Sequence, residues 1–368
     1  MIPGDPRSLA RRALARWSLS GENLQVRLFA RRENFVFRVT TSAQGATGLS
    51  HDATRETSAS AKSAIKGAAG RATSEATADR AVGSVAIGTG NHKGAGFALR
   101  LHRPGLRDHS QVHAELAWMQ AMAKVGIPVP APLPSTSGSL LEVVDGVRFS
   151  LLRWIDGEPL GRGGRLVRRA GAEAALAELG RQMALLHQAT EAWIPPLGFN
   201  RPAWDMAGLV GEQPLWGRFW DRAELTETQV DLLSRARIRA AEKLAALAPP
   251  LRLIHADLIP DNVLLGSDGS VHLIDFDDCG WGFREFELAT TISRLERAEH
   301  PEPLIGALLS GYAAVEPVDE QALPLMLALR HFTYIGWVSD RIAEPGAPER
   351  AERLIAAACT HAERLLQT

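Results

Sequence analysis

The fold is decided by a stretch that reads LIHADLIPDNVLLGSDGSVHLIDFDD, from Leu253 to Asp278. Short apolar runs in and just before this stretch alternate with polar residues and glycines, a pattern that is typical of strands joined by tight turns. We therefore expect short strands, with a hairpin between the last two. The apolar runs are Leu251–Ile254, Val263–Leu265 and Val271–Ile274, and the turn residues are Gly266, Ser267, Asp268 and Gly269.

Polar side chains occupy the loops beside these strands. Asp257 and Asn262 share the loop after the first run, and Asp275 follows the last run. Because two loops on adjacent strands can meet at one point, we expect these three side chains to lie close together. Two carboxylates and an amide oxygen are hard-oxygen ligands that suit Mg²⁺ with a base beside it. The alternative is a surface hairpin with acidic turns, but burying a carboxylate against apolar strands is costly unless it is paired or metal-bound.

The spacing of these residues is specific. His-x-Asp-x-x-x-x-Asn from His255 to Asn262, followed by Asp-Phe-Asp from Asp275 to Asp277, is the pattern of kinase-type phosphoryl transfer. On these motifs the chain resembles the superfamily of aminoglycoside phosphotransferases, choline kinases and homoserine kinases, especially its homoserine-kinase-like and stress-response branch. Further segments that carry the resemblance are Arg32-Glu33-Asn34, FALRLHRPG from Phe97, ELAWMQAMAKVGIPVPAP from Glu115 and PLWGRFW from Pro214.

The resemblance covers nearly the whole chain except roughly residues 41–95. It implies an α+β, protein-kinase-like fold with two lobes. The N-lobe, residues 1–155, is expected to be a small antiparallel sheet with one helix that covers the nucleotide. The C-lobe, residues 156–368, is expected to be larger and mainly helical, and to carry the catalytic β-hairpin and the acceptor-binding region.

The resemblance also implies an activity, an ATP- and Mg²⁺-dependent transfer of the γ-phosphate to a hydroxyl of a small molecule. The acceptor would be an amino alcohol, or a compound like homoserine or an aminoglycoside. Asp257 would orient and deprotonate the hydroxyl, while Asn262 and Asp275 would hold Mg²⁺. Asp277 adds a carboxylate near the metals, which either ligates a second ion or repels it. Two residues are expected to support the catalytic loop, namely His255 and Glu287, which stands where the family usually has Asp.

Residues on the N-lobe side are implied to bind ATP. The turn from Phe29 to Asn34 takes the place of the kinase glycine-rich loop but contains no glycine, so Arg32 and Asn34 are expected at the phosphates. Arg100 stands where the family usually has its phosphate-binding lysine, and Glu115 can reach back to it from the next helix. A surface arginine and a solvated glutamate are the alternatives. The hinge that meets adenine is expected at Arg153, Trp154 and Ile155.

The segment 41–95 differs from the rest, since about two-thirds of it is Ala, Gly, Ser or Thr. Such a segment buries too little apolar surface to offset its ordering entropy, so we interpret it as a flexible low-complexity insertion. Near the N-terminus, apolar residues at helical spacing after Asp5 predict an amphipathic helix rather than a transit peptide. Aromatic residues that are either core or a wall of the acceptor pocket are Trp204, Trp216, Phe219, Trp220, Tyr334 and Trp337.

Composition excludes some functions. The chain has 368 residues, with 45% apolar and 23% charged residues, as in soluble proteins of about two domains. A net charge of −1 gives no reason to expect nucleic acid or a membrane as partner. Cys279 and Cys359 cannot form a disulfide framework, which favours the cytoplasm. The oligomeric state stays open, as do two rival functions: a stress-response-type protein Ser/Thr kinase, and a non-catalytic nucleotide-binding regulator.

Overall fold

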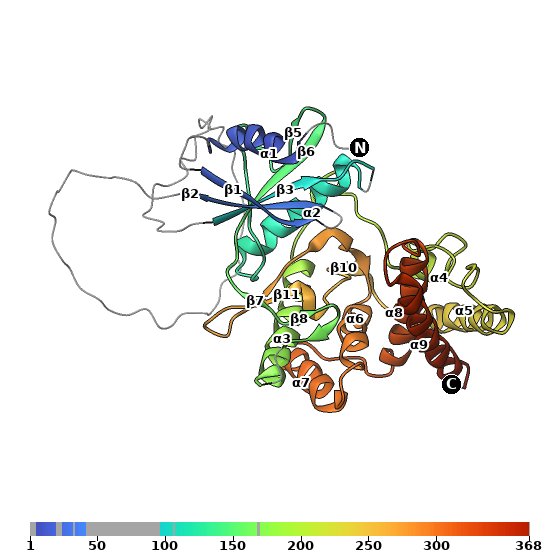
Figure 1. Cartoon of the computed structure of the whole chain (residues 1–368). Coiled ribbons are helices and arrows are strands. Elements are labelled where there is room, and N and C mark those ends of the chain that lie inside the picture. The colour runs from blue at the N-terminus through green and yellow to red at the C-terminus, as the bar shows by residue number, and fades with distance from the viewer. Residues whose placement is uncertain are drawn as a thin grey trace, which may run out of the picture.

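The chain forms two lobes with the expected α+β character (Figure 1). A computed structural model describes residues 5–19, 24–31, 34–41, 96–105, 107–167 and 170–367. Apart from Thr41, the predicted insertion 41–95 lies outside the described residues, and so does Arg32. In Figure 1 the N-lobe is the upper body and the C-lobe the lower one.

The N-lobe is built on an antiparallel sheet with the strand order β1-β2-β3-β6-β4, and β5 also pairs with β6. The turn between β5 and β6 is formed by Asp145 and Gly146, which both have positive φ angles, of 51° and 75°. This is the backbone that a two-residue hairpin turn requires, and Asp-Gly supplies it readily. The strands are β1 (Leu24–Arg31), β2 (Phe35–Thr41), β3 (Gly96–His102), β4 (Pro132–Leu133), β5 (Glu142–Val144) and β6 (Val147–Arg153).

The two faces of this sheet have different partners. Helix α1 (Pro6–Leu14) begins at its N-cap Asp5, continues into a 3₁₀ turn (Ala15–Trp17), and packs against Leu99 and Leu101 of β3. Arg100, between these leucines, points to the opposite face, where α2 (His109–Lys124) supplies its partner Glu115. The period-2 alternation of β3 therefore places the leucines on the face that packs against α1 and Arg100 on the face toward the cleft.

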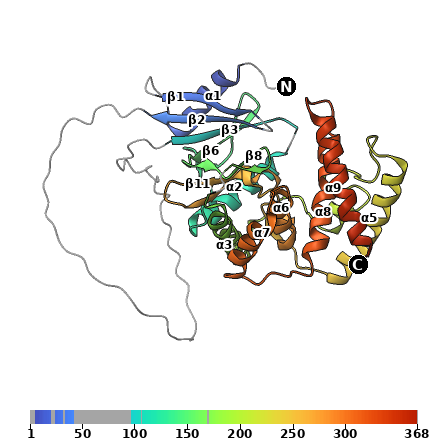
Figure 2. The ribbon, with the colours of Figure 1, turned by 60° about the horizontal axis from the view of Figure 1, so that its bottom comes forward.

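The C-lobe has two adjoining cores. One contains α3 (Ala172–Glu191), part of α6 (Arg284–Leu295), α7 (Pro301–Ala313) and the catalytic strands, and it continues upward into α2. The other lies between α4 (Met206–Val210), α5 (Glu227–Leu247), α8 (Leu323–Ser339) and α9 (Ala347–Gln367). These last four helices form the right-hand side of the molecule in Figures 1 and 2. Among the described residues, no helix is both long and apolar enough to cross a membrane.

The catalytic strands form as predicted but pair less simply. The hairpin of β11 (Val263–Leu265) and β12 (Val271–Leu273) extends through β11 to β7 (Glu158–Pro159). Strand β10 (Arg252–Ile254) pairs with β13 (Gly280–Gly282), so the segment closes on itself. Two more short strands, β8 (Gly161–Arg162) and β9 (Arg165–Leu166), form a separate pair. Since β6 ends at Arg153 and β7 already pairs with β11, the chain crosses between the lobes over residues 154–157.

Candidate active site

Asp257 lies on a loop between β10 and a 3₁₀ turn (Pro260–Asn262) that precedes β11. Its neighbour Ala256 has a φ of 65°, which is costly for a residue with a Cβ atom and is typical of over-determined functional loops. Asn262 Nδ2 donates to the backbone oxygen and to Oδ2 of Asp257, each at 2.9 Å. The two polar residues of the first motif are thus in direct contact, as predicted.

His255 connects the two motif loops. Its Nε2 donates to the backbone oxygen of Ile274 at 2.9 Å, so Nδ1 is the acceptor for the Asp257 N–H at 3.3 Å. The ring also packs on Phe276 with 4.3 Å between ring centroids. With both nitrogens engaged, His255 supports the loop, and nothing here assigns it a proton-transfer role.

Glu287 supports the same loop through hydrogen bonds. It is fully buried in α6, and its Oε1 accepts the Ala256 N–H at 2.8 Å. Its Oε2 lies 2.6 Å from His187 Nε2, and His187 Nδ1 lies 2.7 Å from the Tyr312 hydroxyl. A hydrogen-bonded chain from α7 through α3 and α6 therefore holds the strained residue next to Asp257. This is the bracing position that the resemblance implied.

Asp275, a predicted metal ligand, follows β12 and faces the cleft. Its side chain is exposed to the cleft in a left-handed backbone conformation with a φ of 69°. Desolvation between the lobes, then the carboxylates of Asp277 and Asp257, raise the pKa of Asp275 well above its usual range, although Arg100 opposes this. Carboxylates that destabilise one another are relieved by a cation. Since Asn262 uses Nδ2 to bind Asp257, its Oδ1 is left for the same cation, and the donor set fits Mg²⁺.

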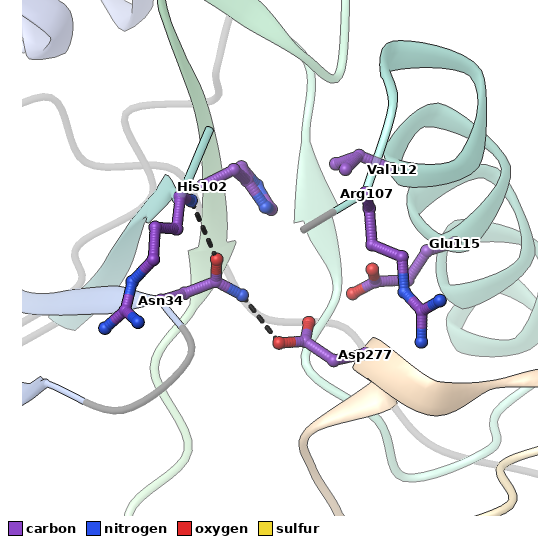
Figure 3. Close-up of a pocket in the computed structure, with 7 residues that line it drawn as sticks. Asn34, His102, Arg107, Val112, Glu115 and Asp277 are labelled. Atoms are coloured by element: carbon purple, nitrogen blue, oxygen red, sulfur yellow. Dashed lines mark hydrogen bonds between the residues drawn. The ribbon is translucent and has the colours of Figure 1, made fainter. Parts of the chain in front are cut away.

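Asp277 has protein partners in this structure. It forms an ion pair with Arg100 and accepts a hydrogen bond of 2.6 Å from Asn34 Nδ2. Figure 3 shows the Asn34 side chain pointing to Asp277. The amide oxygen of Asn34 accepts a hydrogen bond of 3.1 Å from the Arg103 N–H. Asp277 thus joins the N-lobe to the C-lobe.

Arg100 and Glu115 form the strand–helix ion pair that the resemblance implied, with 2.6 Å between Nη1 and Oε1. Both are buried, with exposed fractions of 7% and 1%. Burial lowers the pKa of Arg100, but the carboxylates of Asp277 and Glu115 outweigh it, so the net shift is upward and the arginine stays charged. Arg201, which the sequence did not single out, donates to the backbone oxygens of Cys279 and Asp277 at 2.6 Å each and so fixes this loop.

The hinge residues line an apolar part of the cleft. The N–H groups of Arg153 and Trp154 bind the backbone oxygens of Ala131 and Gly96, at 2.9 and 3.0 Å. Among the described residues, the backbone of Ile155 has no hydrogen-bond partner. The Trp154 ring meets Phe29 edge-on, with 4.9 Å between centroids. Of the three predicted hinge residues, Ile155 is therefore the one with neither backbone group in a hydrogen bond within the described chain.

Arg330 is a site residue that the sequence reading missed. From α8 its Nη2 donates to Asp257 Oδ1 at 2.8 Å, and its Nη1 to the Ala256 backbone oxygen at 3.2 Å. The residue is 4% exposed. A buried arginine must be paired, so the Arg330-His331 pair within the apolar run of α8 was the signal that could have revealed it.

A single cleft of about 1780 Å³ joins these parts. It is lined by the hinge, by Asp257, Asn262, Asp275 and Asp277, and by α6, α8 and α9. Of the aromatic residues left open above, Trp216, Tyr334 and Trp337 line this cleft, whereas Trp204, Phe219 and Trp220 are buried in the core.

Comparison with known proteins agrees with this geometry. Residues 82–325 match the sequence profile of a family described as the phosphotransferase enzyme family. An uncharacterized protein of Deinococcus radiodurans is 32% identical over 266 residues, which are 67% of this chain and 72% of that one. A homoserine kinase of Sinorhizobium medicae is 32% identical over 228 residues, or 59% of this chain. The chain spans 65% of the length of that kinase.

Solved structures show the same fold. A microcompartment-associated aminopropanol kinase superposes with a TM-score of 0.71 and 23% identity over 98% of each chain. The amicoumacin kinase, solved with AMP-PNP and Ca²⁺, gives a TM-score of 0.66 and 18% identity over 97% of this chain and 94% of that one. These likenesses confirm the predicted kinase-like, bilobal α+β fold.

Proposed function

Because the chain belongs to the phosphotransferase enzyme family, we propose that it transfers the γ-phosphate of ATP to a hydroxyl group of a small molecule with the help of Mg²⁺. The observation that carries this proposal is the convergence of Asp257, Asn262 and Asp275 on one cleft, which is also lined by Arg100, the arginine paired with Glu115. Two similar proteins are an aminopropanol kinase and a homoserine kinase, which are named after an amino alcohol and an amino acid.

Asp257 is the proposed catalytic base. Asn262 and Arg330 each hold one of its carboxylate oxygens, so the group has one defined orientation. An acceptor hydroxyl that donates to Asp257 would be aligned for attack on the γ-phosphate and would lose its proton to this carboxylate. A positioned base of this kind contributes roughly 10²- to 10⁴-fold to the rate.

Asn262 and Asp275 are the proposed Mg²⁺ ligands. When bound, Mg²⁺ neutralises negative charge on the phosphates of ATP. The carboxylate of Asp277 lies near the proposed metal ligands, but it already binds Arg100 and Asn34. Its main proposed role is therefore to connect the two lobes. Arg100 keeps its charge and a planar fork of donors, which suits phosphate oxygens as well as carboxylates. Asn34 and the backbone of Ile155 complete the proposed ATP site.

The proposed location is the cytoplasm. Both cysteines are free thiols, and Cys279 is buried against the catalytic loop. The fold therefore needs no oxidising compartment.

The test is a transfer assay with ATP and Mg²⁺ in which product is identified by mass spectrometry. Homoserine, ethanolamine, choline, aminopropanol, glycerate, glycerol 3-phosphate, an aminoglycoside and a Ser/Thr-rich protein are offered separately. Phosphate on a small molecule supports the proposal. Transfer only to the protein supports a protein kinase, and ATP binding without transfer to any acceptor supports a nucleotide-binding regulator.

A further inference from the structure

Four arginines gather on the wall of the cleft that lies beyond Asp257, and we call them the arginine cluster. All four line the cleft, although they come from three separate elements. Figure 2 shows α6 in the middle of the C-lobe, with α8 and α9 to its right. The members are Arg165 in β9, Arg294 near the end of α6, Arg297 just after it and Arg353 in α9.

Among the described residues, no arginine of this cluster has a carboxylate within ion-pair distance, although Asp261, Glu296 and Glu302 also line the cleft. By contrast, Arg330 pairs with Asp257, and Arg350 pairs with Glu344. Glu296 lies between two members in sequence, but it is held by His331 and His361, at 3.0 and 3.4 Å. The acid between Arg294 and Arg297 is therefore already engaged by two histidines.

The members are close enough to repel one another. A methyl group at Gly164 would stand 2.9 Å from Nη1 of Arg297 and 3.5 Å from Nη1 of Arg294. Partial burial, then the charges of Arg294, Arg165 and Arg353, lower the pKa of Arg297. Like charges that destabilise each other in this way are stabilised when an anion binds among them.

The cluster is connected to the catalytic base through one ring. The guanidinium of Arg294 lies 4.2 Å from the centre of the Tyr334 ring, and that of Arg330 lies 4.5 Å from the same centre. Arg330 in turn contacts Asp257. In addition, Nε of Arg294 is buried without a hydrogen-bond partner among the described residues. The cluster therefore lines the same cavity that a hydroxyl at Asp257 would occupy.

We propose that the arginine cluster binds an oxyanion of the acceptor, so that the molecule phosphorylated at Asp257 is an anionic hydroxy compound. This inference rests on the proposed function and names its substrate class. A carboxylate and a phosphate monoester share the chemistry that arginine forks recognise. The positive charge of the arginine cluster disfavours purely cationic acceptors, such as choline.

The test is calorimetric and needs no turnover. Protein saturated with Mg²⁺ and AMP-PNP, which fill the nucleotide site, is titrated separately with glycerate, glycerol 3-phosphate, glycerol and choline. We expect glycerate or glycerol 3-phosphate to bind, and the anion that binds more tightly identifies the preferred group as a carboxylate or a phosphate. We expect glycerol and choline not to bind. The double variant Arg297→Gln/Arg353→Gln should weaken anion binding roughly tenfold or more, because it removes charge-assisted hydrogen bonds.

Two controls separate a binding role from a structural one. Arg297 and Arg353 are exposed and form no ion pair within the described part of the chain, so the double variant should unfold at the same temperature as the wild type or above it, since repulsion is relieved. Arg239→Gln, on α5 and paired with Glu242, should leave anion binding unchanged.

Three results would overturn the inference: no binding of either anion, equal binding by the double variant, or choline bound as tightly as the anions. None of these results shows whether phosphate is transferred. Transfer is tested separately, by the acceptor assay and by the Asp257→Asn variant. The substrate class and the activity can therefore fail independently.

Discussion

At the scale of single residues, the catalytic aspartate is defined by partners that lie far from it in sequence. Asn262 belongs to the same motif, but Arg330 comes from α8 and reaches both Asp257 and the backbone of Ala256. The motif spacing predicted the first contact. It did not predict the second, because Arg330 has no fixed spacing from the motif and acts only through tertiary packing.

Replacing Arg330 tests its role as a positioning residue. Arg330→Gln removes a charge-assisted contact, so kcat should fall about tenfold to a hundredfold while the KM for ATP stays unchanged. Arg330→Lys keeps the charge but not the fork, so it should recover part of the loss. A parallel rise in the KM for ATP, or no recovery with lysine, would contradict the role.

The role of Asp277 could be predicted only in part from its place in the motif. The resemblance placed it near the metals, and its carboxylate does lie close enough to raise the pKa of Asp275. Its contacts with Arg100 and Asn34 depend on a β3 arginine and a β1–β2 turn that follow no common spacing. The residue types were predictable, whereas the pairing needed the folded lobes.

At the scale of elements, Glu296 ties three helices together. It lies at the end of α6 and contacts His331 of α8 and His361 of α9, whose rings stack with 4.1 Å between centroids. Burial raises the pKa of Glu296, but hydrogen bonds from both histidines outweigh it and bring the value to about 2. The anion is thus the form that the folded protein prefers.

This contact predicts a pH-dependent stability. A carboxyl with a folded pKa below its unfolded value of about 4.3 stabilises the fold above that pH, and the effect is lost as pH falls toward the folded pKa. Glu296→Gln should therefore cost about 2 to 3 kcal/mol at pH 7, and progressively less as the pH falls from about 4.5 toward 2. Urea unfolding across this range measures it, with Glu352→Gln on the exposed side of α9 as the control. A difference that does not change with pH would contradict the assignment.

Elements were predictable where they are regular or fixed by a local turn. Strands β11 and β12 form where the sequence placed them, and Asp145-Gly146, a strong turn signal in the sequence, closes the hairpin of β5 and β6. The sequence after the catalytic hairpin predicts a helix from Leu288 to Glu296, but helix α6 begins four residues earlier, at Arg284. The sequence did not predict α7. Strands β7, β8 and β9 have two residues each, too few for a period, and β7 forms only because β11 lies beside it.

At the scale of the whole molecule, the N-lobe meets the C-lobe through the apolar core that α2 shares with the C-lobe, and through a small polar clasp at Asp277. Asp277 of the C-lobe is held by Arg100 from β3 and by Asn34 from the β1–β2 turn. The insertion predicted between the second and third strands would adjoin this sheet, but its residues lie outside the described part, so it stays a prediction. The two-lobed arrangement itself was predictable from the motif pair, because the resemblance it carries spans both lobes.

A double-mutant cycle tests the clasp. Asn34→Ala and Asp277→Asn should each lower the free energy of unfolding, and together they should cost less than the sum, with a coupling of about 1 to 3 kcal/mol. The exposed pair Arg38 and Asp156, whose charged atoms lie 3.2 Å apart, provides the matched control and should couple by less than about 1 kcal/mol. Additive effects of Asn34 and Asp277 would show that their contact does not join the lobes.

The central claim is that Asp257 is the base of a phosphoryl transfer to a hydroxyl. The most direct test compares wild type, Asp257→Asn and the hairpin-turn control Asp268→Asn in transfer from ATP to the best acceptor of the panel. We predict that only Asp257→Asn loses roughly 10²- to 10⁴-fold in kcat, while its calorimetric affinity for Mg²⁺·ATP stays at the wild-type level. Transfer by Asp257→Asn at the wild-type rate would contradict the account.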